Sequence, residues 1–351
     1  MKKNLYLLVL LLLPILFCSQ GVFSMDNRSP NISGLPILQV KDIPKPAGEP
    51  GNLVVLDWAG FKSAVTYTYD DAQPSHVAHY AELQATGVPM TFFVSSNVNW
   101  LPNSDPFWAQ VVKDGNEIGN HTVSHPYSSL NGSCFGKPLD SIDAEIDECT
   151  KYIIERFGQS DVWTMAAPYG DKGYKEYAKT RLFLNRGVNS GTIAPNDDSD
   201  PFNMPCFMAN GGESATVFNR EIDSAESEGK WLIFLFHSID PTSDKWYATV
   251  DIAEITQSID HAKSLGDIWI DTFANVGAYW MGQKLLTSAT PTKSGDELTW
   301  TWTLPEHFPK GKYLRVKVDG GTLKQGGKVL EWDSHGYYEI ALDEGSLTLV
   351  P

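Results

Sequence analysis

Short apolar runs alternate with longer amphipathic stretches through the middle of the chain. The runs are rich in β-branched and aromatic residues, which is typical of strands buried on both faces. Between them, apolar residues recur at helical spacing; one stripe consists of Ile142, Ile146, Cys149 and Ile153. This alternation predicts a parallel sheet or barrel surrounded by helices.

The expected elements follow from these patterns. Strands are predicted at residues 63–69, 90–95, 162–167, 183–188, 231–238 and 267–270. Helices are predicted near residues 76–85, 106–114, 141–157, 174–180 and 247–265. Because chemistry collects at the carboxyl ends of strands in such folds, polar residues that follow a strand are the candidates for function.

The pattern changes near the end of the chain, where apolar and polar residues begin to alternate one by one. This holds for residues 298–304, 314–318, 337–342 and 347–350, with glycine pairs at 320–321 and 326–327 for turns. After about residue 279 we expect no further helix. Residues 284–351 are predicted to form a small antiparallel β module, and either sugar binding or simple packing would suit it.

The beginning of the chain predicts export. Lys2 and Lys3 precede an apolar run over residues 5–17, which indicates a signal peptide of residues 1–24 and a secreted or periplasmic protein. A lipid anchor at Cys18 is disfavoured, since the residues before it are not small. Residues 25–60 form a Pro- and Gly-rich lead-in segment, which leaves residues 61–283 for the main domain.

The composition of the chain argues against several classes of binding partner. With 27 basic and 43 acidic residues, the formal net charge of −16 argues against binding to nucleic acid or to anionic lipid. No segment after the signal peptide is long and apolar enough to span a membrane. Cys134, Cys149 and Cys206 are odd in number, so at most one disulfide can form among them; for Cys149 on its apolar stripe we favour packing.

Carboxylates and imidazoles stand near the ends of predicted strands. Asp70 and Asp71 end the first strand, His121 and His125 lie four residues apart, and His237 closes the strand at 231–238. One Asp and two His make the three-ligand set of an open catalytic zinc site. The second Asp can then accept a proton from water, and a separate His can protonate a leaving group.

Four sequence motifs in this order resemble one family. They read Thr68-Tyr69-Asp70-Asp71-Ala72, His121-Thr122-Val123-Ser124-His125, Pro168-Tyr169-Gly170 and Leu235-Phe236-His237. Over residues 63–279 the chain resembles the polysaccharide deacetylases of carbohydrate esterase family 4, with their nodulation-type deacetylase domain. The resemblance implies an α/β fold, a distorted barrel of seven β/α units.

The resemblance also implies an activity and residue roles. The activity is metal-dependent hydrolysis of acetyl groups from an acetylated glycan by metal-activated water, and the metal is zinc, with cobalt or another divalent ion as alternatives. The roles carried over are metal binding by Asp71, His121 and His125, general base for Asp70, oxyanion donation by the Tyr169 backbone, general acid for His237, and pocket walls from Leu235 and Pro168.

One departure from the family stands out. Many members carry an arginine two residues before the Pro of the Pro-Tyr-Gly motif, paired with a later acid; here that position is Ala166, and no matching acid is found. A glycan-binding protein with impaired catalysis is therefore an alternative, as is an amidase acting on a non-sugar substrate. The glycan, the choice between amide and ester, and the oligomeric state are not encoded in these motifs.

Overall fold

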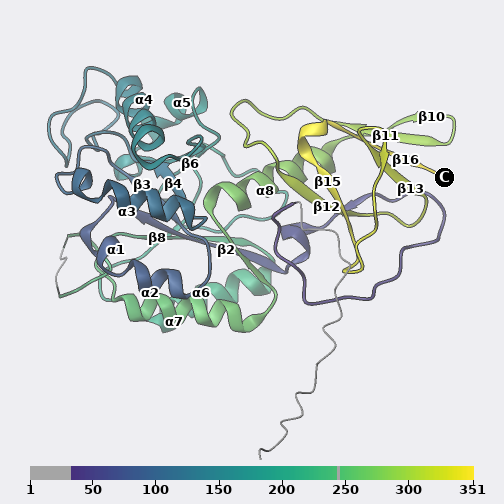
Figure 1. Ribbon diagram of the computed structural model, residues 1–351, viewed down its shortest axis with the longest axis horizontal. Helices are drawn as coiled ribbons and strands as arrows, with labels where there is room; N and C mark the ends of the chain where they lie inside the picture. Colours follow the sequence, from purple (N-terminus) through teal and green to yellow (C-terminus); the bar gives the residue numbers. More distant parts are fainter. Residues whose placement is uncertain (1–32, 243–245) are drawn as a thin grey trace, which may run out of the picture. The chain divides into compact units, whose positions relative to one another are not determined.

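A parallel sheet curls into a distorted barrel and carries the candidate site (Figure 1). The computed structural model describes residues 33–242 and 246–351, which belong to one compact unit. The predicted signal peptide and Cys18 lie outside the described residues.

Seven parallel strands form the barrel in the spatial order β6-β5-β4-β3-β2-β8-β7. Arg186 at the end of β6 bridges to Met204, just before β7, so the two edges of the sheet approach each other. A further strand, β9, pairs with the first half of β2, whereas β3 pairs with its second half. The expected barrel is confirmed. The bounds are β2 Ser63–Asp70, β3 Thr91–Val94, β4 Glu117–Asn120, β5 Thr164–Ala166, β6 Leu184–Arg186, β7 Phe207–Met208, β8 Trp231–Phe236 and β9 Ile268–Ile270.

Helices follow most of the strands and pack around the sheet. Their bounds are α1 Pro74–Ala78, α2 Tyr80–Ala85, α3 Leu101–Lys113, α4 Ile142–Tyr152, α5 Lys175–Lys179, α6 Ala215–Glu228, α7 Ile252–Leu265 and α8 Phe273–Ser288. The expectation that helices end near residue 279 was wrong, because α8 continues to Ser288. This helix is buried on most sides, so its sequence shows no amphipathic stripe. In the described ranges no helix combines the length and apolar character needed to cross a membrane.

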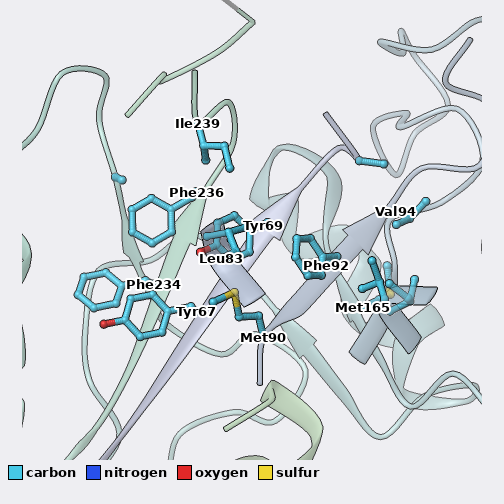
Figure 2. Close-up of a cluster of buried hydrophobic side chains, with 14 of the residues drawn as sticks. Tyr67, Tyr69, Leu83, Met90, Phe92, Val94, Met165, Phe234, Phe236 and Ile239 are labelled. Carbon is cyan, nitrogen blue, oxygen red and sulfur yellow. The ribbon is translucent and has the colours of Figure 1, made fainter. Parts of the chain in front are cut away.

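Aromatic side chains fill the main core on both sides of the central strand. All eight residues of β2 are buried, so the polar residues that alternate with Val65, Tyr67 and Tyr69 lie in the protein interior as well. Tyr69 stacks on Phe92 at a centroid distance of 5.0 Å, and Tyr67 stacks on Phe234 at 5.3 Å (Figure 2). This packing fixes β2 between β3 and β8 and so fixes the two carboxylates at its end.

Two antiparallel sheets follow the barrel. One has the order β1-β12-β15 and the other β10-β11-β16-β13-β14. Strand β1 comes from the predicted lead-in segment, and buried Arg315 of β12 donates to the Ala59 carbonyl at 3.0 Å. Leu314 and Leu342 share a core cluster with Trp231 of the barrel. The boundary at 283/284 stays a prediction. The bounds are β1 Val54–Val55, β10 Thr292–Ser294, β11 Glu297–Thr301, β12 Tyr313–Lys317, β13 Thr322–Gln325, β14 Lys328–Val329, β15 Tyr338–Ala341 and β16 Ser346–Val350.

Candidate metal centre and pocket

The carboxyl ends of the barrel strands open into a pocket of about 470 Å³. Loops that follow β2, β4, β5, β6 and β8 supply most of its walls. The pocket brings together groups that lie far apart in the sequence, as parallel strands require. Its lining residues are Asp70, Asp71, His121, His125, Cys134, Ala167, Tyr169, Gly170, Val188, Met208, Leu235, His237, Trp246 and Tyr247.

Asp71, His121 and His125 form a candidate metal centre. One potential ligand atom from each lies within 4.8 Å of the others, and all three residues are buried. Asp71 Oδ1 is 3.5 Å from His121 Nε2 and 3.8 Å from His125 Nε2. This buried carboxylate oxygen accepts no hydrogen bond from any described residue. A buried anion facing two imidazole nitrogens fits a divalent cation such as zinc.

Hydrogen bonding fixes the orientation of His121. Its Nδ1 lies 2.8 Å from the carbonyl oxygen of Ala166, which can only accept, so Nδ1 carries the proton. Nε2 is then left with its lone pair toward Asp71, as a metal ligand requires.

A buried glutamate holds the loop between the two histidines. Glu145 of α4 accepts hydrogen bonds from the backbone N–H of Ser124 at 2.8 Å and from its hydroxyl at 2.7 Å. At the start of the loop, the Asn120 side chain accepts from Thr122 N–H at 2.7 Å and donates to the Ile146 carbonyl at 2.8 Å. These bonds satisfy buried backbone groups of an irregular loop and fix its path.

The backbone of the site adopts unusual conformations. Asp71, Thr122, His125 and Tyr169 all have positive φ values, of 72°, 66°, 55° and 57°. Non-glycine residues seldom occupy this left-handed region, because the Cβ atom crowds the backbone. Strain of this kind clusters at functional sites, where the surrounding structure compensates for it.

Asp70 has a partner that the sequence analysis missed. Arg186, at the end of β6, donates through Nη2 to both carboxylate oxygens of Asp70, to Oδ1 at 2.5 Å. Both side chains are buried, with exposed fractions of 0% for Arg186 and 3% for Asp70. Arg186 is the direct neighbour of Ala166 in the β5–β6 register. The expectation that Asp70 lacks an arginine partner was therefore wrong: the guanidinium comes from the strand adjacent to Ala166.

The charges of the site set the protonation of its members. Burial alone would raise the pKa of Asp70, but Arg186, followed by His121 and His237, lowers it below its usual range. The pKa of Asp71 is also lowered against the effect of burial, first by His121 and then by His125. Both carboxylates are therefore ionised near neutral pH, as a base and a metal ligand require.

The pKa values of the three histidines in the pocket shift in different directions. Burial, together with the neighbouring His121, lowers the pKa of His125 to about 4. Although burial also opposes protonation of His121, Asp70 and Asp71 raise its pKa. For His237, burial lowers the pKa more than Asp70 and Asp71 raise it. His125 and His237 are thus neutral near pH 7.

The remaining predicted site residues lie around the same pocket. His237 packs edge-on against Tyr247 at 4.8 Å, and its Nδ1 has no hydrogen-bond partner among the described residues. Leu235 lines the pocket, as expected. At the Pro168–Gly170 turn the wall is formed by Tyr169 and Gly170, whereas Pro168 is buried and does not line it.

Two further pocket residues were also missed. Trp246 donates from its indole Nε1 to Asp71 Oδ2 at 3.2 Å, and Cys134 Sγ lies 3.1 Å from the Tyr169 hydroxyl. Both come from irregular loops without a motif to mark them. The cysteines of the described chain are all free, with Cys134 exposed and Cys149 and Cys206 buried.

Comparison with known proteins agrees with this site. Residues 60–182 match the sequence profile of the polysaccharide deacetylase family. A 186-residue stretch is 26% identical to an uncharacterised protein, YlxY, of Bacillus subtilis (strain 168), covering 53% of this chain and 49% of that one. The chain thus spans about half the length of this curated relative.

Solved structures show partial similarity. A family 4 acetyl xylan esterase from Clostridium thermocellum, in complex with a cobalt ion, is 18% identical, with a TM-score of 0.40 over 61% of this chain and 89% of that one. The catalytic domain of a peptidoglycan N-acetylglucosamine deacetylase from Eubacterium rectale ATCC 33656 is 17% identical, with a TM-score of 0.41 over 60% and 89%.

The fold and the site define an α/β barrel with a candidate metal centre at the carboxyl ends of its strands. Residues 60–182, which match the profile of the polysaccharide deacetylase family, include Asp70, Asp71, both metal-centre histidines and the Tyr169 turn. Over these residues the family match confirms the resemblance inferred from the motifs.

Proposed function

We propose that the protein is a metal-dependent carbohydrate deacetylase that hydrolyses acetyl groups and releases acetate. The observation that carries this proposal is the presence in one pocket of a candidate three-ligand metal centre and a separate, arginine-paired carboxylate, Asp70. A binding protein gains nothing from keeping a second buried carboxylate ionised beside the metal ligands. A hydrolase needs that group as a base.

The residues would divide the chemistry as follows. Asp71, His121 and His125 would hold zinc or a similar divalent ion, which supplies Lewis acidity for a water molecule and for the acetyl carbonyl. Asp70 would accept the proton of the attacking water, held in place by its arginine. The backbone N–H of Tyr169, presented by a left-handed turn, would donate to the oxyanion.

His237 would protonate the departing amine or alcohol. Because its imidazole is neutral near pH 7, it must gain a proton before it can act as an acid. Among the described residues, no acid is hydrogen-bonded to His237 Nδ1. The proton would therefore reach His237 from another group in the pocket or from solvent.

The pocket suits a sugar substrate. Tyr169, Trp246 and Tyr247 line it and are 38%, 47% and 54% exposed, so their rings offer apolar surface to a pyranose. Leu235 is buried in the wall and would contact the acetyl methyl. We propose an acetylated glycan, either an N-acetylglucosamine polymer or an O-acetylated polysaccharide such as xylan. Export is proposed from residues 1–24 alone, which lie outside the described residues.

Acetate release tests the proposal. The purified protein would be stripped with a chelator and assayed with zinc or cobalt added back, on chitooligosaccharides, acetylated xylan and an aryl acetate. We expect release that depends on metal and is lost in Asp70→Asn, while that variant still binds metal. A metal-loaded, folded protein that releases acetate from none of these would favour the glycan-binding alternative, and turnover of small non-sugar amides alone would favour the amidase.

A further inference from the structure

Trp246 connects the rim of the pocket to a proposed metal ligand. Its indole N–H reaches Asp71 Oδ2 at 3.2 Å although the ring is about half exposed. Gln73 donates to the same oxygen through Nε2 at 3.4 Å, and it is buried. Two donors from different segments therefore converge on one oxygen of a carboxylate that is almost fully buried.

The two oxygens of Asp71 are thereby made different. Oδ2 is occupied by neutral donors, whereas Oδ1 has no hydrogen-bond partner in the described chain and faces the Nε2 atoms of His121 and His125. A carboxylate can turn about its Cβ–Cγ bond, and a bond to one oxygen restricts that rotation. The indole bond thus selects the orientation in which a single oxygen points at the histidines.

The indole ring is itself held in place. Trp246 stacks on Phe135 at a centroid distance of 5.8 Å and an interplanar angle of 23°. Phe135 in turn packs edge-on against His125 at 5.8 Å. Through its N–H and through Phe135, Trp246 therefore adjoins two of the three proposed ligands.

We propose that Trp246 is a positioning residue for Asp71 that raises the affinity of the centre for its divalent metal. The inference rests on the proposed function only in requiring that the three residues bind a metal. It concerns the orientation of a ligand, and neither the identity of the glycan nor turnover enters into it.

Trp246→Phe separates the N–H from the ring. Phenylalanine keeps an aromatic face against Phe135 and removes the N–H donor to Asp71. Loss of an outer hydrogen bond to a metal ligand typically costs about 10- to 100-fold in metal affinity, and we expect a loss of this size for zinc. Trp332→Phe is the matched control, because its indole donates to the Ile43 carbonyl at 2.8 Å, outside the pocket.

The measurement is zinc affinity of the full chain by competition with a chromophoric chelator, together with the absorption spectrum of the cobalt-loaded protein. We expect weaker zinc binding and an altered cobalt spectrum in Trp246→Phe, and wild-type values in Trp332→Phe. Equal affinity and equal spectra in wild type and Trp246→Phe would overturn the inference, while acetate release by both would leave the proposed function standing. A wild-type protein that binds no zinc or cobalt would overturn both.

Discussion

Replacement of Arg186 by methionine tests whether the guanidinium from β6 sustains Asp70 as a base. Methionine fills a similar volume without charge, so the substitution leaves Asp70 buried among His121, His237 and apolar side chains. Burial then becomes the dominant influence on the Asp70 carboxyl. Its pKa is expected to rise.

The size of the effect follows from the burial of both partners. Removing one member of a buried ion pair costs about 3–5 kcal/mol, because the other charge is left uncompensated. Protonation of Asp70 removes the uncompensated charge, so the carboxyl in Arg186→Met is expected to take up a proton at a higher pH than in wild type, and this uptake limits the loss of stability.

The assay is the pH dependence of kcat/KM for acetate release. The acidic limb of the profile should move toward neutral pH in Arg186→Met, and activity below that limb should fall by about 100-fold or more, the usual contribution of a general base. Zinc affinity should stay close to that of wild type, because Asp70 is not among the proposed ligands. Arg186→Lys retains the charge if the methionine variant fails to fold.

A relocated arginine provides the sharper test. Ala166 and Arg186 are direct partners on neighbouring parallel strands, and their side chains project to the same face of the sheet. The double variant Ala166→Arg, Arg186→Ala would supply the guanidinium from β5 and should recover part of the activity lost in Arg186→Ala. A folded Arg186→Met protein with an unshifted acidic limb and full activity would refute the assignment.

Three further predictions concern stability and thiol reactivity. Burial lowers the pKa of His125 from 6.5 to about 4. Between these pH values the imidazole is protonated in the unfolded chain but not in the folded one, so acid favours unfolding. After removal of metal by a chelator, the protein should lose about 3 kcal/mol of stability as the pH falls from 6.5 to 4. Urea unfolding should show a clearly smaller loss in His125→Asn, and an equal loss would contradict this. In the folded protein a thiol reagent should label exposed Cys134 rapidly and leave Cys149 unlabelled, because Cys149 is buried and burial raises its pKa to about 12. Mass spectrometry of the labelled peptides measures this difference. Rapid labelling of Cys149 would contradict its burial in the core. In Gly282→Ala the added Cβ would lie 2.6 Å from Cδ1 of the fully buried Leu342. The overpacking costs about 1–3 kcal/mol, and the higher helix propensity of alanine offsets about 1 kcal/mol of it. The urea midpoint should therefore fall, and a raised midpoint would show that Leu342 moves aside without cost.

Local patterns were sufficient to predict the barrel and the metal centre. The apolar runs that became β2, β3 and β8 are buried on both faces, so their composition alone distinguishes them. Asp70 is the last residue of β2, Asp71 follows it directly, and the two metal-centre histidines lie in one segment after β4. Because each group is attached to a strand end or lies close after one, placing the strands in parallel was enough to bring them together.

Helix α8 shows where pattern reading fails. Its residues are buried against the barrel on one side and against the C-terminal sheets on another, so apolar side chains surround it. Amphipathic spacing depends on an exposed face, which this helix largely lacks. The proposed domain boundary at 283/284 lies within this helix and stays a prediction.

Arg186 could not be found by any local rule, because its role depends on which residue it meets across two strands. The signal that was present is a charged residue inside the predicted strand 183–188, where burial is costly unless a partner lies nearby. That signal says only that a buried anion is needed somewhere. Identifying Asp70 as that anion requires the strand order β6-β5-β4-β3-β2 and the curl of the sheet, which brings the β6 side chain across the barrel. The family motif places the arginine at the position of Ala166. Here Arg186, its direct partner on the neighbouring strand β6, supplies the guanidinium to Asp70 instead, so the ion pair is present although the motif is not.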